Sequence, residues 1–189
     1  MRHTGFVMRL FVALWPPADV AETLTAAAAA VAVGREGRDI RPTASHRLHL
    51  TCAFIGDASG RQAADVSDHL ADVAVAHAAI DLALDEGGHF GDRVLWAGPS
   101  QPPPELASLA KATRVAIRAA GLTVQGNAFR PHVTLGRVRE DAILTPVADR
   151  LTELLTADPV AWHADDYCLV SSVRAATSTY EIVERWSLA

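Results

Sequence analysis

The sequence predicts an α+β fold, built from antiparallel strands and packed helices. Short runs that are apolar, or that alternate in polarity, recur along the chain between Gly- and Pro-containing segments, as strands do. Helix-forming segments follow the first two of these runs. Two pairs of runs, one in the middle of the chain and one at its end, favour antiparallel pairing. The fold class is therefore α+β and not a doubly wound parallel sheet.

Seven strands are predicted from these runs. The first, residues 9–14, is an apolar run ended by a Pro-Pro pair, and the second, residues 47–55, alternates in polarity up to a Gly-Asp pair. A glycine-rich connection at 87–91 is predicted to join the two strands in the middle into an antiparallel pair. The five remaining predicted strands are residues 80–84, 93–97, 130–138, 167–173 and 180–188.

Four helices are predicted between the strands. The first carries acidic residues in its first turn, where they suit the helix dipole, and ends before Gly34. The second has Ala63, Val66 and Leu70 on one face, which is the spacing of a helix packed against a core. The predicted helices are residues 18–33, 61–78, 105–120 and 146–156.

Composition limits the classes of partner. Half of the residues are apolar and 21% are charged, which is typical of a folded globular protein. The net charge is −5, so the chain lacks the broad basic surface with which proteins hold long nucleic acids. Any nucleic-acid substrate is therefore expected to bind in a local pocket.

Length and apolar runs predict the domain organisation and the location. We expect residues 8–189 to form a single domain and residues 1–7 a short N-terminal extension, because the strand pattern begins at Met8. No apolar run is long enough to span a bilayer. Cys52 and Cys168 are too few for a disulfide framework. We therefore expect a cytoplasmic protein with no membrane association. We also expect a monomer and predict no protein partner, although the sequence carries no direct signal of the oligomeric state.

Two tripeptides in predicted strands carry the candidate chemistry. They are His49-Leu50-Thr51 and His132-Val133-Thr134. Because a strand repeats every two residues, the His and the Thr of each tripeptide share one face. If the two halves pack as a pair, two imidazoles and two hydroxyls meet in one cleft. Such a cleft suits a phosphate, because hydroxyls donate to its oxygens while one histidine accepts a proton and the other donates one.

These segments resemble a known family. HLTCAFIG from His49 and FRPHVTLGR from Phe129 resemble the paired H-x-T-x motifs of the 2H phosphoesterase superfamily. Within it, the sequence is most similar to the RNA 2′,3′-cyclic phosphodiesterase family, also called 2′-5′ RNA ligase-like. RLFVALWPP at 9–17, RVLWAG at 93–98 and residues 180–188 extend the resemblance along the chain.

The resemblance implies a bilobal, pseudo-symmetric fold with two antiparallel sheets facing across a central cleft, helices outside, and no metal or cofactor. It implies hydrolysis of an RNA or oligonucleotide 2′,3′-cyclic phosphate end to a 2′-phosphate. His49 would be the general acid for the departing 3′ oxygen, and His132 the general base that activates water. Thr51 and Thr134 would hold phosphate oxygens, and Arg137 matches a family arginine near the phosphate.

Several neighbouring side chains have two interpretations. Strict alternation puts Arg137 on the face opposite His132, so a role at the phosphate needs a bulge or a strand end, and the alternative is a surface ion pair. Phe54 lies outside the parity of His49 and is predicted to be in the core. Trp15 and Trp96 either belong to the core or stack on a base.

Three other functions are consistent with parts of the pattern. The same site run in reverse would join RNA ends through a 2′-5′ bond. A binding module could hold terminal phosphates without turnover, although binding alone needs no matched acid and base. A metal site built from His49, His132 and acidic residues lacks a tight ligand cluster in the sequence, and loss of activity in EDTA would support it.

Overall fold

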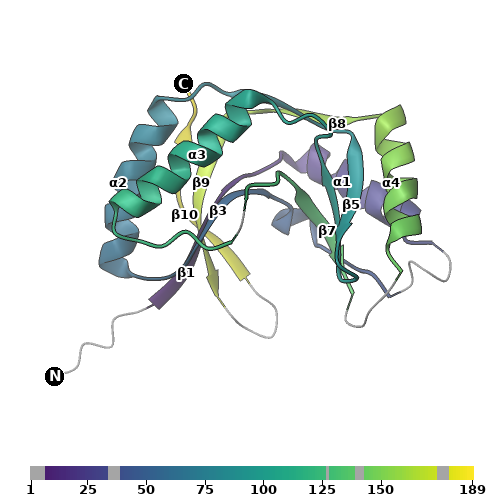
Figure 1. Cartoon of the computed structure of the whole chain (residues 1–189), viewed down its shortest axis with the longest axis horizontal. Helices are drawn as coiled ribbons and strands as arrows, with labels where there is room; N and C mark the ends of the chain where they lie inside the picture. Colours follow the sequence, from purple (N-terminus) through teal and green to yellow (C-terminus); the bar gives the residue numbers. More distant parts are fainter. Residues whose placement is uncertain (1–6, 34–38, 127, 139–142, 174–178) are drawn as a thin grey trace.

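The computed structural model describes residues 7–33, 39–126, 128–138, 143–173 and 179–189 (Figure 1). The helices in these ranges are α1 (Ala18–Val31), α2 (Gly60–Val75), α3 (Pro104–Ala119), α4 (Thr145–Ala157) and the short 3-10 helix η1 (Ser45–Arg47). The strands are β1 (Val7–Leu14), β2 (Arg41–Pro42), β3 (Leu50–Ser59), β4 (Ile80–Leu84), β5 (Glu86–Phe90), β6 (Val94–Gly98), β7 (Val133–Arg137), β8 (Val160–Ala164), β9 (Asp166–Val173) and β10 (Thr179–Ser187).

The predicted α+β class is confirmed, and every strand pairing in the described ranges is antiparallel. The large sheet has the order β10-β9-β1-β3-β7-β6-β5, with β2 also on β7. In the described ranges its two halves are paired at one position, Leu50 of β3 with Val133 of β7. In Figure 1, α2 and α3 lie beside the half with β1, β3, β9 and β10, and α1 and α4 beside the half with β5 and β7. The molecule is therefore bilobal.

The pairing predicted in the middle of the chain is wrong. β4 pairs with β8, a strand that the sequence analysis missed, and β6 pairs with β5 and β7. The glycine-rich stretch at 87–91 overlaps β5 instead of connecting two strands. Two of its glycines serve close packing: a Cβ on Gly87 would lie 2.7 Å from Leu151 Cβ, and one on Gly88 would lie 2.0 Å from the Trp96 ring. The closing pair, β9 with β10, is confirmed.

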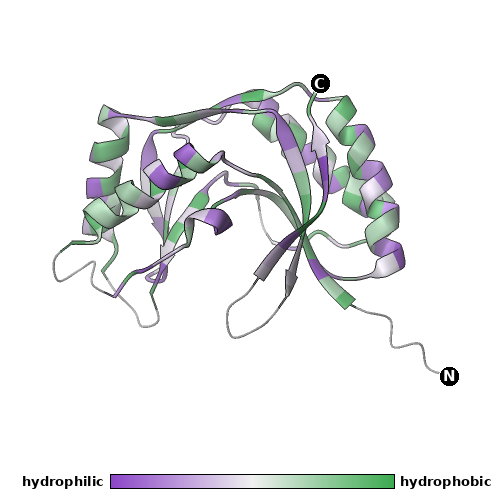
Figure 2. Ribbon diagram, turned by 180° about the vertical axis from the view of Figure 1, so that it is seen from behind, coloured by the Kyte–Doolittle hydropathy of each residue, from purple (hydrophilic) through white to green (hydrophobic). Residues whose placement is uncertain are grey.

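The four predicted helices are present, with ends that differ from the prediction by at most three residues. Helix α2 begins with a capping box, in which the Ser59 hydroxyl accepts from the Gln62 amide and the Gln62 side chain accepts from the Ser59 amide. Figure 2 shows hydrophobic and hydrophilic residues alternating along the helices, as in helices with one face on a sheet. None of the helices in the described ranges is long and apolar enough to cross a membrane.

The core lies mainly between the sheet and the helices, and a second small cluster lies on the opposite face of β1 and β9. Both cysteines are free and buried, and burial raises the pKa of the Cys52 thiol to about 12. Trp15 and Tyr180 pack on the second cluster, which forms part of the floor of the pocket described next. The members of this cluster are Phe11, Ala13, Cys168 and Val170.

Candidate active site

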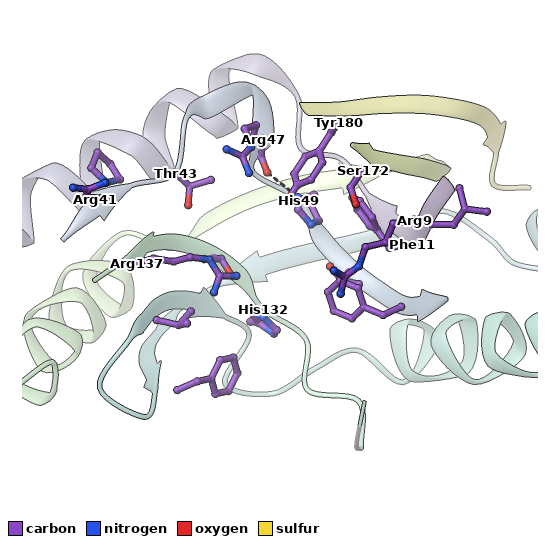
Figure 3. A pocket seen from close by; sticks show the side chains of 17 residues that line it. Arg9, Phe11, Arg41, Thr43, Arg47, His49, His132, Arg137, Ser172 and Tyr180 are labelled. Carbon is purple, nitrogen blue, oxygen red and sulfur yellow. Dashed lines mark hydrogen bonds between the residues drawn. The ribbon is translucent and has the colours of Figure 1, made fainter. Parts of the chain in front are cut away.

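A cavity of about 760 Å³ opens on the face of the sheet opposite the helices (Figure 3). The five residues predicted from the sequence all line it, namely His49, Thr51, His132, Thr134 and Arg137. Strands from both halves contribute, including β1, β3, β9 and β10 from one half and β2, β5, β6 and β7 from the other. The structure thus brings together residues from two distant parts of the chain.

The position at which β3 pairs with β7 explains why the two tripeptides face one cleft. Leu50 pairs with Val133, and these are the middle residues of the two motifs. Both middle side chains are fully buried in the core, so the flanking His and Thr of each motif point to the opposite face of the sheet. Antiparallel pairing at this point sets each histidine across from the other motif's threonine.

A bulge in β3 moves Phe54 into the pocket, so its predicted place in the core is wrong. The pairing with β1 skips Cys52, since Val12 pairs with Ala53 and Ala13 with Thr51. Cys52 and Ala53 are both buried, and the alternation of buried and exposed side chains is shifted by one residue beyond them. The Phe54 side chain is 47% exposed and lines the pocket.

A matching bulge in β7 places Arg137. Leu95 of β6 pairs with Gly136 and Trp96 with Thr134, so Leu135 is the extra residue. Leu135 and Gly136 are both buried, and Arg137 returns to the face that carries His132 and Thr134. The bulge that a role for Arg137 at the phosphate requires is therefore present.

The two imidazoles are held by equivalent hydrogen bonds. Nδ1 of His49 lies 2.7 Å from the Arg47 carbonyl oxygen, and Nδ1 of His132 lies 2.8 Å from the Arg130 carbonyl oxygen. A carbonyl only accepts, so each Nδ1 carries a hydrogen and donates it. In each neutral ring Nε2 is therefore the unprotonated nitrogen, which can accept a proton or, once protonated, donate one.

Aromatic side chains pack against both histidines. Trp15 stacks on His49 with ring centroids 5.1 Å apart, and Phe11 and Tyr180 contact the same imidazole at 4.9 and 5.3 Å. Phe90 and Trp96 flank His132 at 4.8 and 6.3 Å. Trp96 is 2% exposed and belongs to the core, which was one of the two interpretations of this residue. These rings fix the imidazoles and exclude water from their faces.

Two arginines repeat the symmetry of the motifs. Arg47 lies over the Tyr180 ring at 4.8 Å, and Arg130 lies over the Trp96 ring at 4.5 Å. Each arginine precedes its histidine by two residues and also supplies the carbonyl that holds that histidine. The sequence signal for this arrangement is the repeat Arg-x-His-x-Thr, of which the sequence analysis used only the last three positions.

The pocket is positively charged although the chain is acidic. Its lining includes Arg9, Arg41, Arg47 and Arg137 and, among the residues that the structure describes, no Asp or Glu. This local concentration of positive charge suits an anionic ligand. Sequence reasoning singled out only one of these four arginines, because the others come from β1, β2 and η1, and only the tertiary fold brings them together.

Both imidazoles favour the neutral form. Burial lowers the pKa of His49 to about 4, against the hydrogen bond to Arg47, and the nearby charges of His132, Arg47 and Arg137 lower it further. Burial also lowers the pKa of His132, as do Arg137 and Arg130. At neutral pH without an anion, both histidines are therefore uncharged.

A search of the described ranges finds no cluster of three His, Cys, Asp or Glu side chains that could hold a metal ion. The two histidines face a pocket whose other polar groups are hydroxyls and guanidinium groups, which do not favour a cation. The described donor set therefore fits a phosphate better than a metal.

Comparisons with known proteins show the family to which the chain belongs. A family model for the 2′-5′ RNA ligase superfamily matches residues 14–176. The chain is 33% identical over 139 residues to an Escherichia coli RNA 2′,3′-cyclic phosphodiesterase, covering 73% of this chain and 76% of that protein. It is 27% identical over 194 residues to a Thermus thermophilus protein of the same name, covering 96% and 90%. The crystal structure of E. coli LigT in apo form superposes with a TM-score of 0.78 at 28% identity, covering 96% of this chain and 98% of that chain.

Proposed function

Because the chain belongs to the 2′-5′ RNA ligase superfamily and its curated relatives are RNA 2′,3′-cyclic phosphodiesterases, we propose that it hydrolyses 2′,3′-cyclic phosphate ends of RNA to 2′-phosphomonoesters. One observation carries the proposal: two imidazoles, each with Nδ1 bound to a carbonyl, share one arginine-lined pocket with two threonines. The enzyme would act as a cytoplasmic monomer without metal, cofactor or protein partner.

The proposed reaction uses one neutral and one protonated histidine. Nε2 of neutral His132 takes a proton from water, and the water oxygen attacks phosphorus. The bond from phosphorus to the 3′ oxygen breaks, and the proton on Nε2 of His49 passes to that oxygen. Thr51 and Thr134 donate to the nonbridging oxygens, and Arg137 offsets the charge that develops on them. The products are a 2′-phosphate and a 3′-hydroxyl, and exchange with water restores the protons.

Ligation remains a second reaction of the same site. A ribose hydroxyl in the place of water would open the cyclic phosphate to a 2′-5′ bond, with the same proton transfers. The pocket is lined from both lobes, and water at its bulk concentration outcompetes a ribose hydroxyl as the nucleophile. We therefore propose hydrolysis as the main reaction.

The test of the proposed function is the product of one defined substrate. The purified protein is incubated, with EDTA present, with an oligoribonucleotide that ends in a 2′,3′-cyclic phosphate, and the position of the product phosphate is determined. The expected product is a 2′-phosphate. Binding without turnover would favour the end-binding module, a 2′-5′-linked product would favour ligation, and loss of activity in EDTA alone would favour a metal site.

The pH dependence follows from the histidine pKa values. Because both pKa values lie below the usual 6.5 in the free protein, the singly protonated state forms only as the pH falls. We expect kcat/KM to rise as the pH is lowered from about 8 to about 6 and to fall again once the second imidazole is protonated. A bound phosphate favours the protonated imidazole, so the kcat optimum lies at higher pH. A kcat/KM that stays flat over this range would contradict the two-histidine mechanism.

A further inference from the structure

Two arginines are neighbours across paired strands beside the catalytic residues. Arg41 of β2 pairs directly with Arg137 of β7, and both line the pocket. Like charges directly opposite one another on an antiparallel pair destabilise it. The arrangement becomes favourable when an anion lies between the two guanidinium groups, which bind phosphate oxygens in a bidentate manner.

The backbone holds Arg41 close to β7. The Thr43 amide donates to the Leu135 carbonyl at 2.8 Å, and Pro42 pairs with Gly136. A Cβ on Gly136 would lie 2.6 Å from Ile40 Cγ2 and 3.1 Å from the Arg41 carbonyl oxygen, so only glycine allows β2 to approach this closely. The two arginines are thus set side by side by the fold and not by a flexible loop.

Among the described residues, the positive charge at this end of the pocket has no acidic counterpart. None of the described pocket-lining residues is acidic, and among the described residues no ion pair involves either arginine. Thr43 adds a hydroxyl beside Arg41. A cationic pair with a hydroxyl donor is the chemistry that recognises a phosphate group.

Of the two arginines, Arg137 lies near the catalytic histidines and Arg41 lies further from them (Figure 3). Arg137 lies near enough to both histidines to lower their pKa values. In Figure 3, Arg137 lies between the two histidines and Arg41, and Arg41 and Thr43 lie together at the far side. Since Arg137 serves the terminal phosphate in the proposed reaction, Arg41 is one step further along the pocket.

We propose that Arg41, with Thr43 and the near side of Arg137, forms a second phosphate subsite for the phosphodiester on the 5′ side of the terminal nucleotide. A cyclic phosphate closes the 3′ end of its RNA, so the next phosphate of the chain lies on the 5′ side. The preferred substrate is then an oligonucleotide and not a mononucleotide 2′,3′-cyclic phosphate. This inference rests on the proposed function and adds the substrate length to it.

The test compares three substrates with the wild type and with Arg41→Ala and Arg41→Gln. The substrates are a mononucleotide 2′,3′-cyclic phosphate, a dinucleotide with the same end and a 5′-hydroxyl, and that dinucleotide with an uncharged methylphosphonate at the internal position. We expect the wild type to favour the charged dinucleotide over the mononucleotide in kcat/KM by about tenfold, the usual worth of a hydrogen bond to a charged group. Both variants should remove most of that advantage, and so should the methylphosphonate.

The matched control is Arg61→Ala, which removes the same charge from an exposed position on α2 and should leave the substrate ratio as in the wild type. An equal loss on all three substrates in the Arg41 variants would overturn the subsite. A mononucleotide carrying an added 5′-phosphate tests the source of the phosphate: a gain as large as the dinucleotide's would overturn the assignment to the phosphodiester of a longer chain. Wild-type protein that hydrolyses none of the substrates would instead contradict the proposed function itself.

Discussion

Replacing either histidine is expected to lower kcat by about 10²- to 10⁴-fold, because each removes one of the two proton transfers. His49→Asn and His132→Asn are the sharpest variants. An asparagine amide can still donate to the Arg47 or Arg130 carbonyl as Nδ1 does, but it has no group at the position of Nε2. Single-turnover hydrolysis of a cyclic phosphate-ended RNA measures the loss, and thermal unfolding checks that the fold is intact.

The pH profiles of the two variants separate the two roles. The general acid must be protonated, so its ionisation gives the alkaline limb of the profile, and the general base must be neutral, so its protonation gives the acidic limb. We expect the residual activity of His49→Asn to lose the alkaline limb and that of His132→Asn to lose the acidic limb. The opposite pattern would exchange the roles, and activity within a few-fold of the wild type would show that the histidine does not transfer a proton.

Arg137→Ala is expected to lower kcat by about 10²- to 10³-fold, as removal of one donor to a developing negative charge does in other enzymes. The bulge at Leu135 places this guanidinium on the face of both histidines. Arg137→Lys should recover part of the loss, because it restores the charge but not the paired donors. Steady-state kinetics at saturating substrate measures the effect, with Arg61→Ala as the control for lost charge.

The same variant has a second readout. Arg137 lowers the pKa of both imidazoles, so its removal should move both limbs of the kcat/KM profile to higher pH. A purely structural role would lower the activity without moving the profile. A kcat within tenfold of the wild type, together with an unchanged pH profile of kcat/KM, would favour the alternative interpretation of Arg137 as a surface residue.

Local sequence was sufficient for the family, the fold class and the paired motifs. Strand alternation depends only on the backbone, so His49 and Thr51, or His132 and Thr134, share a face wherever the strand packs. The resemblance to the RNA 2′,3′-cyclic phosphodiesterase family, read from those motifs, is confirmed by the family match and the curated relatives. Helices were predictable for the same reason, because an apolar stripe and its end signals lie within one segment.

Strand pairing and β-bulges could not be predicted from local sequence patterns. The sequence of a strand does not identify its partner when long-range packing determines the pairing. For this reason the sequence predicts pairing of β4 with β6, whereas β4 pairs with β8. The glycines of β5 resemble a connecting loop in the sequence. Their structural role is to leave space for the side chains of Trp96 and Leu151, and local sequence does not show those contacts. A bulge interrupts the alternation of side chains between the two faces of a strand, and no single residue type identifies it. For this reason the sequence predicts a core position for Phe54.

The charge of the pocket was likewise decided by the tertiary structure. Arg9, Arg41 and Arg47 lie on separate elements, and each alone is an ordinary surface cation in the sequence. They share a pocket because β2 packs tightly on β7, and because β3 and β7 meet at Leu50 and Val133. The sequence thus determined which chemical groups are available and how each motif presents them, since those properties are local. The tertiary structure decided which groups meet, because that depends on contacts between residues far apart in the chain.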